Sequence, residues 1–225
     1  MKTTPLLALA CLLCADSLAA ATDNLAPQLK FTWVDPADPA TADIRRLGEQ
    51  MIQRVASGMN REVQHLLAAK GPEAALDEVH LKNLQLPAGA PSKPRIAAVK
   101  RTSLHVRQPA NLPDSAELAA LLSIQTELMD GNRPPKLLVQ HIEAAGTAPA
   151  EWRIYRPIGV TAQCLACHGP IISLSSGVRD KLARLYPEDK AVDYSASDWR
   201  GVLRVSIVTP SSAPATAEPA ATKLP

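Results

Sequence analysis

Residues 151–170, EWRIYRPIGVTAQCLACHGP, join an extended segment directly to a cysteine motif. The first ten residues are rich in aromatic and β-branched side chains, which favour a β-strand. A C-x-x-C-H motif formed by Cys164, Cys167 and His168 follows at once, with no room for an intervening helix. This order predicts a sheet domain in which the motif stands at the end of one strand.

The segments around this stretch predict helices first and strands later. We expect helices over residues 41–71, 72–84, 115–131 and 175–187, from apolar residues at three- and four-residue steps and from capping residues. We expect strands over residues 95–107, 136–144, 151–160 and 201–208. Strands joined by short turns indicate an antiparallel sheet, so the predicted fold class is α+β.

The helix over residues 115–131 is predicted in the most detail. Ser115 is expected to cap its N-terminus and Gly131 to end it. Its apolar face is expected to consist of Leu118, Leu121, Leu122 and Leu128.

Two regions lie outside the predicted domain, which spans residues 41–209. Residues 22–40 contain several prolines and are expected to form an irregular N-terminal extension. Residues 210–225 consist mainly of Ala, Pro, Ser and Thr, a composition that predicts a disordered tail.

The first 21 residues have the pattern of a secretory signal peptide. Lys2 precedes a short apolar run, and small residues near Ala19 suit cleavage. The run is too short for a membrane span, so we expect a periplasmic protein with no stable membrane span. Cys11 and Cys14 would leave with the signal, so the mature chain would keep two cysteines and could have no disulfide framework.

Three chemistries are possible for these two cysteines. A structural zinc site requires four ligands, and without Cys11 and Cys14 only scattered histidines could complete the set. A dithiol of the thioredoxin type requires a βαβ unit, which the pattern lacks. In covalent haem attachment the thiols bond the two vinyl groups and the adjacent histidine binds the iron. We predict one covalent haem c on Cys164, Cys167 and His168, and a zinc or dithiol protein if no haem is attached.

The charge of the chain gives no sign of a nucleic-acid partner. Among 225 residues the formal net charge is only +2, and no basic surface with interleaved aromatic residues is visible. The length suits one domain of ordinary size.

Four segments in this order resemble the Tll-type, PAS-like c-type haem domain family, a bacterial family formerly of unknown function. They are KRTSLHVRQPANLPD (100–114), residues 151–170, LYPEDKAVDY (185–194) and DWRGVLRVSIV (198–208). The resemblance implies a PAS-like antiparallel sheet with N-terminal and flanking helices, and one covalent haem. Members occur alone in the periplasm or as the sensory part of signalling proteins.

The second iron ligand does not follow from the motif. No methionine comes after His168, so the downstream Met ligand of common cytochromes c is absent. Relatives often carry a cysteine where this chain has Val79. We expect the neighbouring His80 to bind the iron, because imidazole is a common haem ligand. The alternatives are a histidine with a purely structural role at a helix end, or a site open to water or a gas.

Four arginines are candidate partners of the haem propionates. They lie on strands expected near the motif, although each could equally belong to a solvated basic face: Arg101, Arg107, Arg153 and Arg156. Together these features predict a mono-haem c-type cytochrome that acts in electron transfer or in redox or diatomic-gas sensing. It would work with a periplasmic redox or signalling partner protein. The alternative is a haem-dependent enzyme such as a peroxidase, for which the sequence shows no acid–base pair.

Overall fold

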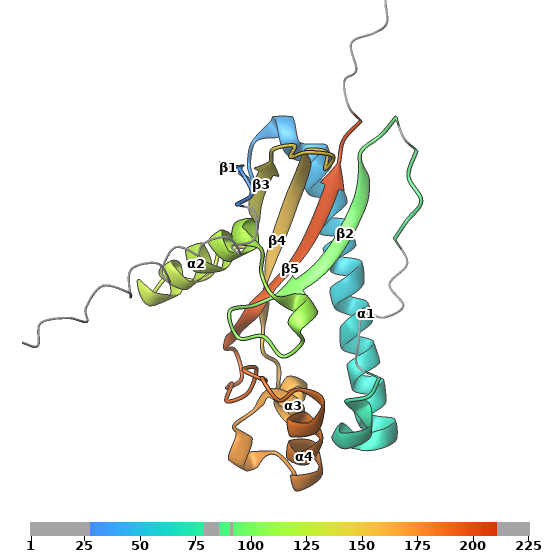
Figure 1. Ribbon diagram of the computed structural model, residues 1–225, viewed down its shortest axis with the longest axis vertical. Helices are drawn as coiled ribbons and strands as arrows, with labels where there is room; N and C mark the ends of the chain where they lie inside the picture. The colour runs from blue at the N-terminus through green and yellow to red at the C-terminus, as the bar shows by residue number, and fades with distance from the viewer. Residues whose placement is uncertain (1–27, 79–85, 91, 211–225) are drawn as a thin grey trace, which may run out of the picture.

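An antiparallel sheet of five strands forms the centre of the computed structural model, which describes residues 28–78, 86–90 and 92–210 (Figure 1). The strand order across the sheet is β1-β3-β4-β5-β2. The strands are β1 (Phe31–Val34), β2 (Arg95–Thr102), β3 (Leu138–Ile142), β4 (Glu151–Gly159) and β5 (Trp199–Val208). All four strand pairs are antiparallel, so the predicted α+β class with a PAS-like sheet is confirmed.

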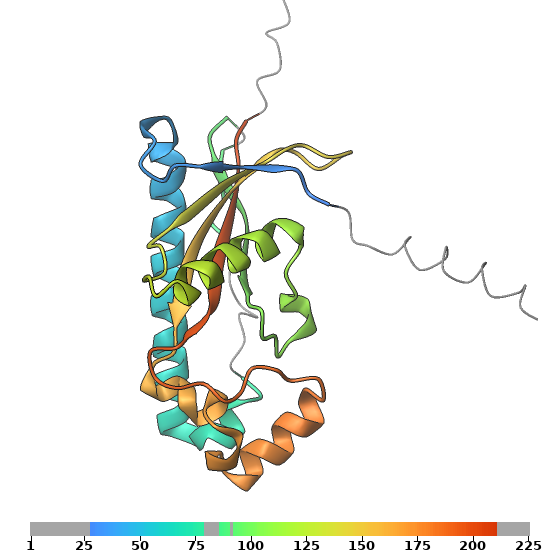
Figure 2. The same cartoon turned by 90° about the vertical axis from the view of Figure 1, so that its left-hand side faces the viewer.

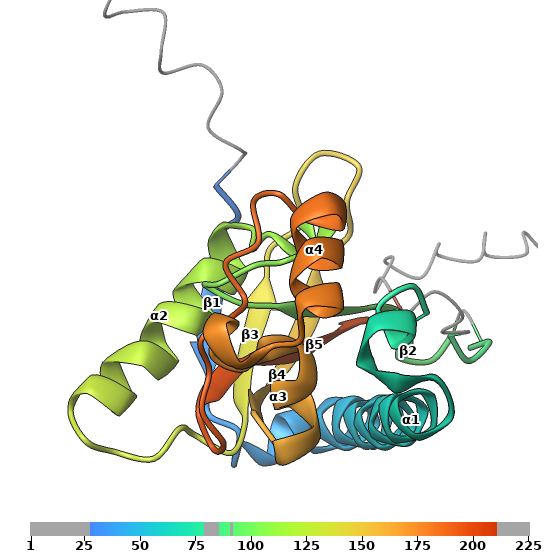
Figure 3. The same ribbon diagram turned by 90° about the horizontal axis from the view of Figure 1, so that it is seen from below.

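Four α-helices accompany the sheet in the described part of the chain. They are α1 (Ala42–Ala75), α2 (Ser115–Met129), α3 (Leu165–His168) and α4 (Ser176–Leu185). Helix α1 runs along one face of the sheet and α2 crosses the opposite face (Figure 2). Helices α3 and α4 lie beyond the lower end of the sheet, between these two layers (Figure 3). No helix in the described ranges is long and apolar enough to span a bilayer.

The main core lies between α1 and the sheet. Ile52 and Val55 of α1 pack with buried residues of β4 and β5, including Ile154 and Val205. Gly48 allows this close approach, since a Cβ added there would lie 2.5 Å from Cγ1 of Ile154. Near its N-terminal end the backbone of α1 therefore packs directly against a side chain of β4.

Helix α1 changes direction where the sequence predicts the boundary between two helices. Gly71 has φ 75° and ψ 170°, a conformation that interrupts the helix and that glycine adopts without a steric penalty. The helical segment that begins with Pro72 ends at Ala75, and the described chain continues only to Glu78. The rest of the predicted second helix, including His80, lies outside the described residues.

The prediction of irregular structure for residues 22–40 is wrong at β1. Phe31–Val34 form an edge strand that pairs with β3, with Phe31 opposite Ile142. The four residues FTWV favour a strand, but such a short segment forms one only when a partner strand is available. That partner comes from a segment more than 100 residues later in the chain.

Two details of α2 also differ from the prediction. Asp114, not Ser115, caps the helix, in a capping box with Glu117. Leu118 and Leu122 are 39% and 46% exposed, so they are wrongly assigned to the buried face. The buried residues are instead Ala116, Glu117, Ala120, Leu121 and Ile124. Alanines on this face allow the helix to lie close to the sheet, and the larger leucines are turned outward.

A cluster of buried ionic groups lies between α2 and the sheet. Glu117 is fully buried; its Oε2 accepts a hydrogen bond from Lys100 Nζ at 2.7 Å, and its Oε1 lies 2.8 Å from Arg204 Nε. The backbone N–H of Asp114 also donates to Glu117 Oε2, at 2.9 Å. A single carboxylate therefore balances the charges of cations on two strands, β2 and β5, and also takes part in the cap of α2.

Strand β2 is shorter than the sequence predicts. It ends at Thr102, whereas the strand was expected to continue to Arg107. Residues 103–107 leave the sheet and cross toward the cysteine motif, where Val106 O accepts a hydrogen bond from Lys190 N at 3.1 Å. The end of β2 thus becomes a wall of the site described below.

Candidate functional site

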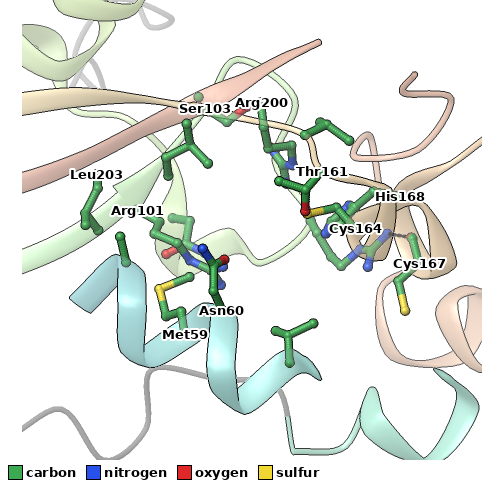
Figure 4. Close-up of a pocket in the computed structure, with 18 of the residues that line it drawn as sticks. Met59, Asn60, Arg101, Ser103, Thr161, Cys164, Cys167, His168, Arg200 and Leu203 are labelled. Atoms are coloured by element: carbon green, nitrogen blue, oxygen red, sulfur yellow. Dashed lines mark hydrogen bonds between the residues drawn. The ribbon is translucent and has the colours of Figure 1, made fainter. Parts of the chain in front are cut away.

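A cavity of about 360 Å³ lies at the end of the sheet, between α1 and the cysteine motif. This volume falls within the range of small-molecule sites, about 300–1,000 Å³. Three walls enclose it: α1, the ends of the central strands, and the motif itself (Figure 4). Representative lining residues are Met59, Val63 and Leu67 from α1, Arg101, Ile158 and Leu203 from the sheet, and Cys164, Cys167 and His168 from the motif.

The motif reaches this cavity because β4 leads straight into it. After Gly159 the chain forms one 3-10 turn, Ala162–Cys164, and then the single helical turn of α3. This tight path brings Cys164, Cys167 and His168 to the wall of the cavity, and both cysteines have free thiols. The predicted direct passage from strand to motif is confirmed.

The segment before β5 fixes the motif from behind. The backbone N–H groups of Asp193 and Tyr194 donate to the carbonyl oxygens of Gly169 and His168, each at 3.0 Å. Arg107 adds hydrogen bonds from Nη2 to Cys167 O at 2.6 Å and from Nε to Asp189 Oδ2 at 2.9 Å. The turn is therefore held in place by backbone hydrogen bonds and by the charged contacts of Arg107.

His168 is oriented as a metal-binding histidine requires. Its Nδ1 lies 2.6 Å from Ala191 O and donates to it, which leaves Nε2 as the nitrogen with a free lone pair. Burial, then the nearby charges of Arg107 and Arg200, lower the pKa of His168 to about 3. The imidazole is therefore neutral at ordinary pH, the state in which it binds metals.

The cavity is strongly electropositive. Among the described residues that line it there is no aspartate or glutamate, but there are four arginines. These are Arg101, Arg107, Arg156 and Arg200. The pKa of Arg101 is lowered by burial and by the charges of Arg200 and Arg107, so these cations repel one another.

The four arginines differ in how far their charges are neutralised. Arg107 forms an ion pair with Asp189. Arg200 donates to His105 O at 2.9 Å and lies over the ring of Tyr194, 5.3 Å from its centroid. Arg101 forms no ion pair and no hydrogen bond with any other described residue. Two half-buried guanidinium groups, Arg101 and Arg200, therefore face the cavity without a carboxylate partner.

The structure brings together six of the eight residues that the sequence singles out. The prediction for Arg153 is wrong, because its guanidinium contacts Asp114 and Glu151 instead of lining the cavity. Cys164, Cys167, His168, Arg101, Arg107 and Arg156 all line the cavity. Arg156 lies at its edge, where Nη1 donates to Gln53 Oε1 at 3.2 Å. His80, the expected second iron ligand, lies outside the described residues.

Several lining residues escape the sequence analysis. Arg200 stands one residue before the predicted start of the last strand, and β5 in fact begins at Trp199, so its place beside the site was not visible. The sequence places Met59 and Asn60 only in a long helix, because nothing local shows that α1 faces the motif. The signal for them is their three- and four-residue spacing from Ala56 and Val63, which line the same cavity.

Five aromatic residues lie near the motif in the sequence, but the fold separates them: Trp152, Tyr155, Tyr186, Tyr194 and Trp199. Tyr155 is buried on the α2 face of the sheet, where its hydroxyl donates to Gln140 Oε1 at 2.7 Å. Trp152 stacks on His141, with ring centroids 4.5 Å apart. Tyr186 does line the cavity. Strand alternation explains this result, because residues on one strand face opposite sides of the sheet.

Comparisons with known proteins place the chain in a family. Curated proteins give no significant match. Among solved structures, the cyanobacterial haem protein Tll0287 is 18% identical, with a TM-score of 0.40, over 70% of this chain and 94% of that one. The model of the Tll0287-like family, described as Tll0287, matches residues 38–208. This match covers well over half of the 225 residues, and the chain therefore belongs to the Tll0287-like family.

Proposed function

We propose that this protein carries one covalent haem c in the cavity at the end of the sheet. Cys164 and Cys167 would form the two thioether bonds, and Nε2 of His168 would bind the iron. The single observation that supports this most is that both free thiols and a neutral, correctly oriented imidazole border one cavity. The family adds support, since Tll0287 itself is described as a haem protein.

The charges of the cavity provide an independent test of fit. Removing a guanidinium partly from water without a counter-charge is costly, and Arg101 and Arg200 are two half-buried groups of this kind. A haem carries two propionates, which would neutralise both cations through charge-assisted hydrogen bonds. Arg107, by contrast, already has Asp189 as its partner and holds the motif. The residues present therefore fit the haem in number of anchors, in iron ligand and in charge.

A bound haem would supply one-electron chemistry at iron and a site for small ligands. We assign this chain to electron transfer, or to redox or diatomic-gas sensing, with a partner protein that receives the electron or reads the state of the iron. The signal-peptide pattern of residues 1–21 supports a periplasmic location, where c-type haem is attached. The chain's own residues hold the porphyrin, keep His168 neutral and cover one side with α1.

The test is expression in the periplasm together with the machinery for c-type haem attachment. We expect the mass of one haem added to the mature chain and a reduced pyridine spectrum typical of two thioether bonds. Cys164→Ser and Cys167→Ser should each remove one thioether, and the double variant should carry no covalent haem. Ile172→Ala is a suitable control, because this residue is 86% exposed and lies near the motif. A wild-type protein that binds zinc, or forms a Cys164–Cys167 disulfide instead, would refute the proposal.

Spectra with gases separate the two roles. A six-coordinate, low-spin iron that binds neither CO nor NO favours electron transfer. An iron that binds either gas readily favours sensing, because the ligand then changes the coordination that a partner could recognise.

A further inference from the structure

We infer that Met59 is the second axial ligand, bound through its Sδ to the iron on the face opposite His168. The inference depends on the proposed haem, but it concerns a residue that the motif and the family pattern do not indicate. The absence of a methionine after His168 does not exclude it, because an upstream helix crosses the cavity.

The position of Met59 follows from the periodicity of α1. Ile52, Ala56, Met59 and Val63 are spaced by four, three and four residues, and all of them line the cavity. Met59 and Asn60 extend from α1 on one side of the cavity, while Cys164 and His168 lie on the other side (Figure 4). The thioether thus lies on the wall facing the proximal histidine.

Few other side chains in the cavity could bind iron. Of the described histidines, His168 alone lines the cavity, whereas His65 is an exposed residue of α1. Tyr186 packs in the same apolar cluster as Cys167. The guanidinium carbon of Arg107 lies over the Tyr186 ring, 5.9 Å from the ring centroid. Tyr186 therefore belongs to the proximal side. Once both thiols are bonded to the haem, Met59 is the remaining soft donor among the described lining residues.

The surroundings of Met59 suit a thioether more than a charged ligand. The side chain is half-buried and packs against the main core, whose buried residues include Leu203. Leu203 pairs with Arg101 across the two strands, so a cation lies close to the same wall. Met–His ligation and nearby positive charge both favour ferrous iron, because each disfavours the extra charge of the ferric state. We therefore expect a high reduction potential, in line with electron transfer.

The experiment observes the methionine methyl groups of the ferrous holoprotein by proton NMR. The mature chain has three methionines, Met51, Met59 and Met129. A methyl group bound over the porphyrin is shifted far upfield by the ring current, and the ferric protein shows a weak far-red thioether-to-iron band. We expect both features in the wild type, both lost in Met59→Leu, and both kept in Met51→Leu, Met129→Leu and His80→Ala.

The control variants make the assignment independent of how Met59→Leu folds. Met51 is buried in the same helix but does not line the cavity, and Met129 is 81% exposed. If both control variants keep the upfield methyl signal, it belongs to Met59 by elimination. An upfield signal missing from the wild type, or surviving in Met59→Leu, overturns the inference. Loss of the low-spin spectrum in His80→Ala alone also overturns it, in favour of His80.

Gas binding gives a quantitative check. When a ligand must displace an internal group, its apparent affinity equals the intrinsic affinity multiplied by the fraction of protein whose site is open. Minor open states of this kind are populated at about 0.1–10%, so Met59→Leu should tighten CO binding by roughly 10- to 1,000-fold. An unchanged CO affinity contradicts Met59 ligation. Protein without covalent haem refutes the proposed function instead, so the two failures are distinguishable.

Discussion

Replacing Glu117 with glutamine should cost the protein much of its stability while leaving the cavity intact. Glu117 has 0% side-chain exposure and contacts Lys100 and Arg204, whose side chains are 23% and 9% exposed. Removing one partner of a buried ion pair costs about 3–5 kcal/mol. Arg204 keeps a second carboxylate, Glu151, with Nη1 and Oε1 3.9 Å apart, so the lower end of that range applies.

We therefore expect Glu117→Gln to lower the free energy of unfolding by about 3 kcal/mol. For a domain of this size each kcal/mol lowers the Tm by about 2–4 °C, so the expected decrease is roughly 6–12 °C. The assay is urea and thermal unfolding of the holoprotein, followed by circular dichroism. Glu127→Gln is the matched control, since Glu127 lies on the same helix and bonds only to Asn132 in an exposed pair.

The control should change the stability by no more than about 0.5 kcal/mol. The visible spectrum of Glu117→Gln should match the wild type, because Glu117 lies on the α2 face and the haem cavity opens on the α1 face. A loss below about 1 kcal/mol would show that the carboxylate is not the common partner of both cations.

Three further predictions follow from α1 and the cavity. Gly48→Ala places a Cβ 2.5 Å from a side chain of β4 and should destabilise the protein by about 1–3 kcal/mol in urea unfolding. Gly58→Ala, in the same helix, meets no atom within 4 Å and should instead stabilise it by about 0.5–1 kcal/mol. Arg101→Gln should lower the midpoint potential of the iron in a redox titration, because it removes a half-buried cation that disfavours the ferric state. Arg133→Gln, an exposed change, should leave that potential unchanged, and equal potentials in both variants would contradict the role of Arg101.

Local patterns predicted most of the elements correctly. The strands around residues 138–142 and 151–159 and the helix over 176–185 fall where alternation and capping residues indicate. The helix break at Gly71 also follows from the residues alone, since a glycine followed by a proline disfavours a continuous helix. These features depend on backbone preferences that act within a few residues.

The predictions that depend on contacts with segments far away in the sequence were wrong. Strand β1 exists because β3 offers an edge to the FTWV segment. The orientation of α2 depends on which of its faces can lie close to the sheet. The face with the small alanines allows a closer approach than the face with Leu118 and Leu122. Neither fact is encoded in the spacing of one segment.

The sequence by itself determined the chemistry of the motif: two thiols and a histidine in one turn at the end of a strand, with arginines on the neighbouring strands. Bonding distances within five consecutive residues do not depend on the rest of the fold. Only the tertiary structure decided what faces that motif, since the opposite wall comes from α1, roughly a hundred residues earlier in the chain. That helix packs on the sheet through burial of apolar surface, which is not encoded in any short segment. Its packing brings Met59 to a cavity in which Arg101 and Arg200 have no carboxylate partner.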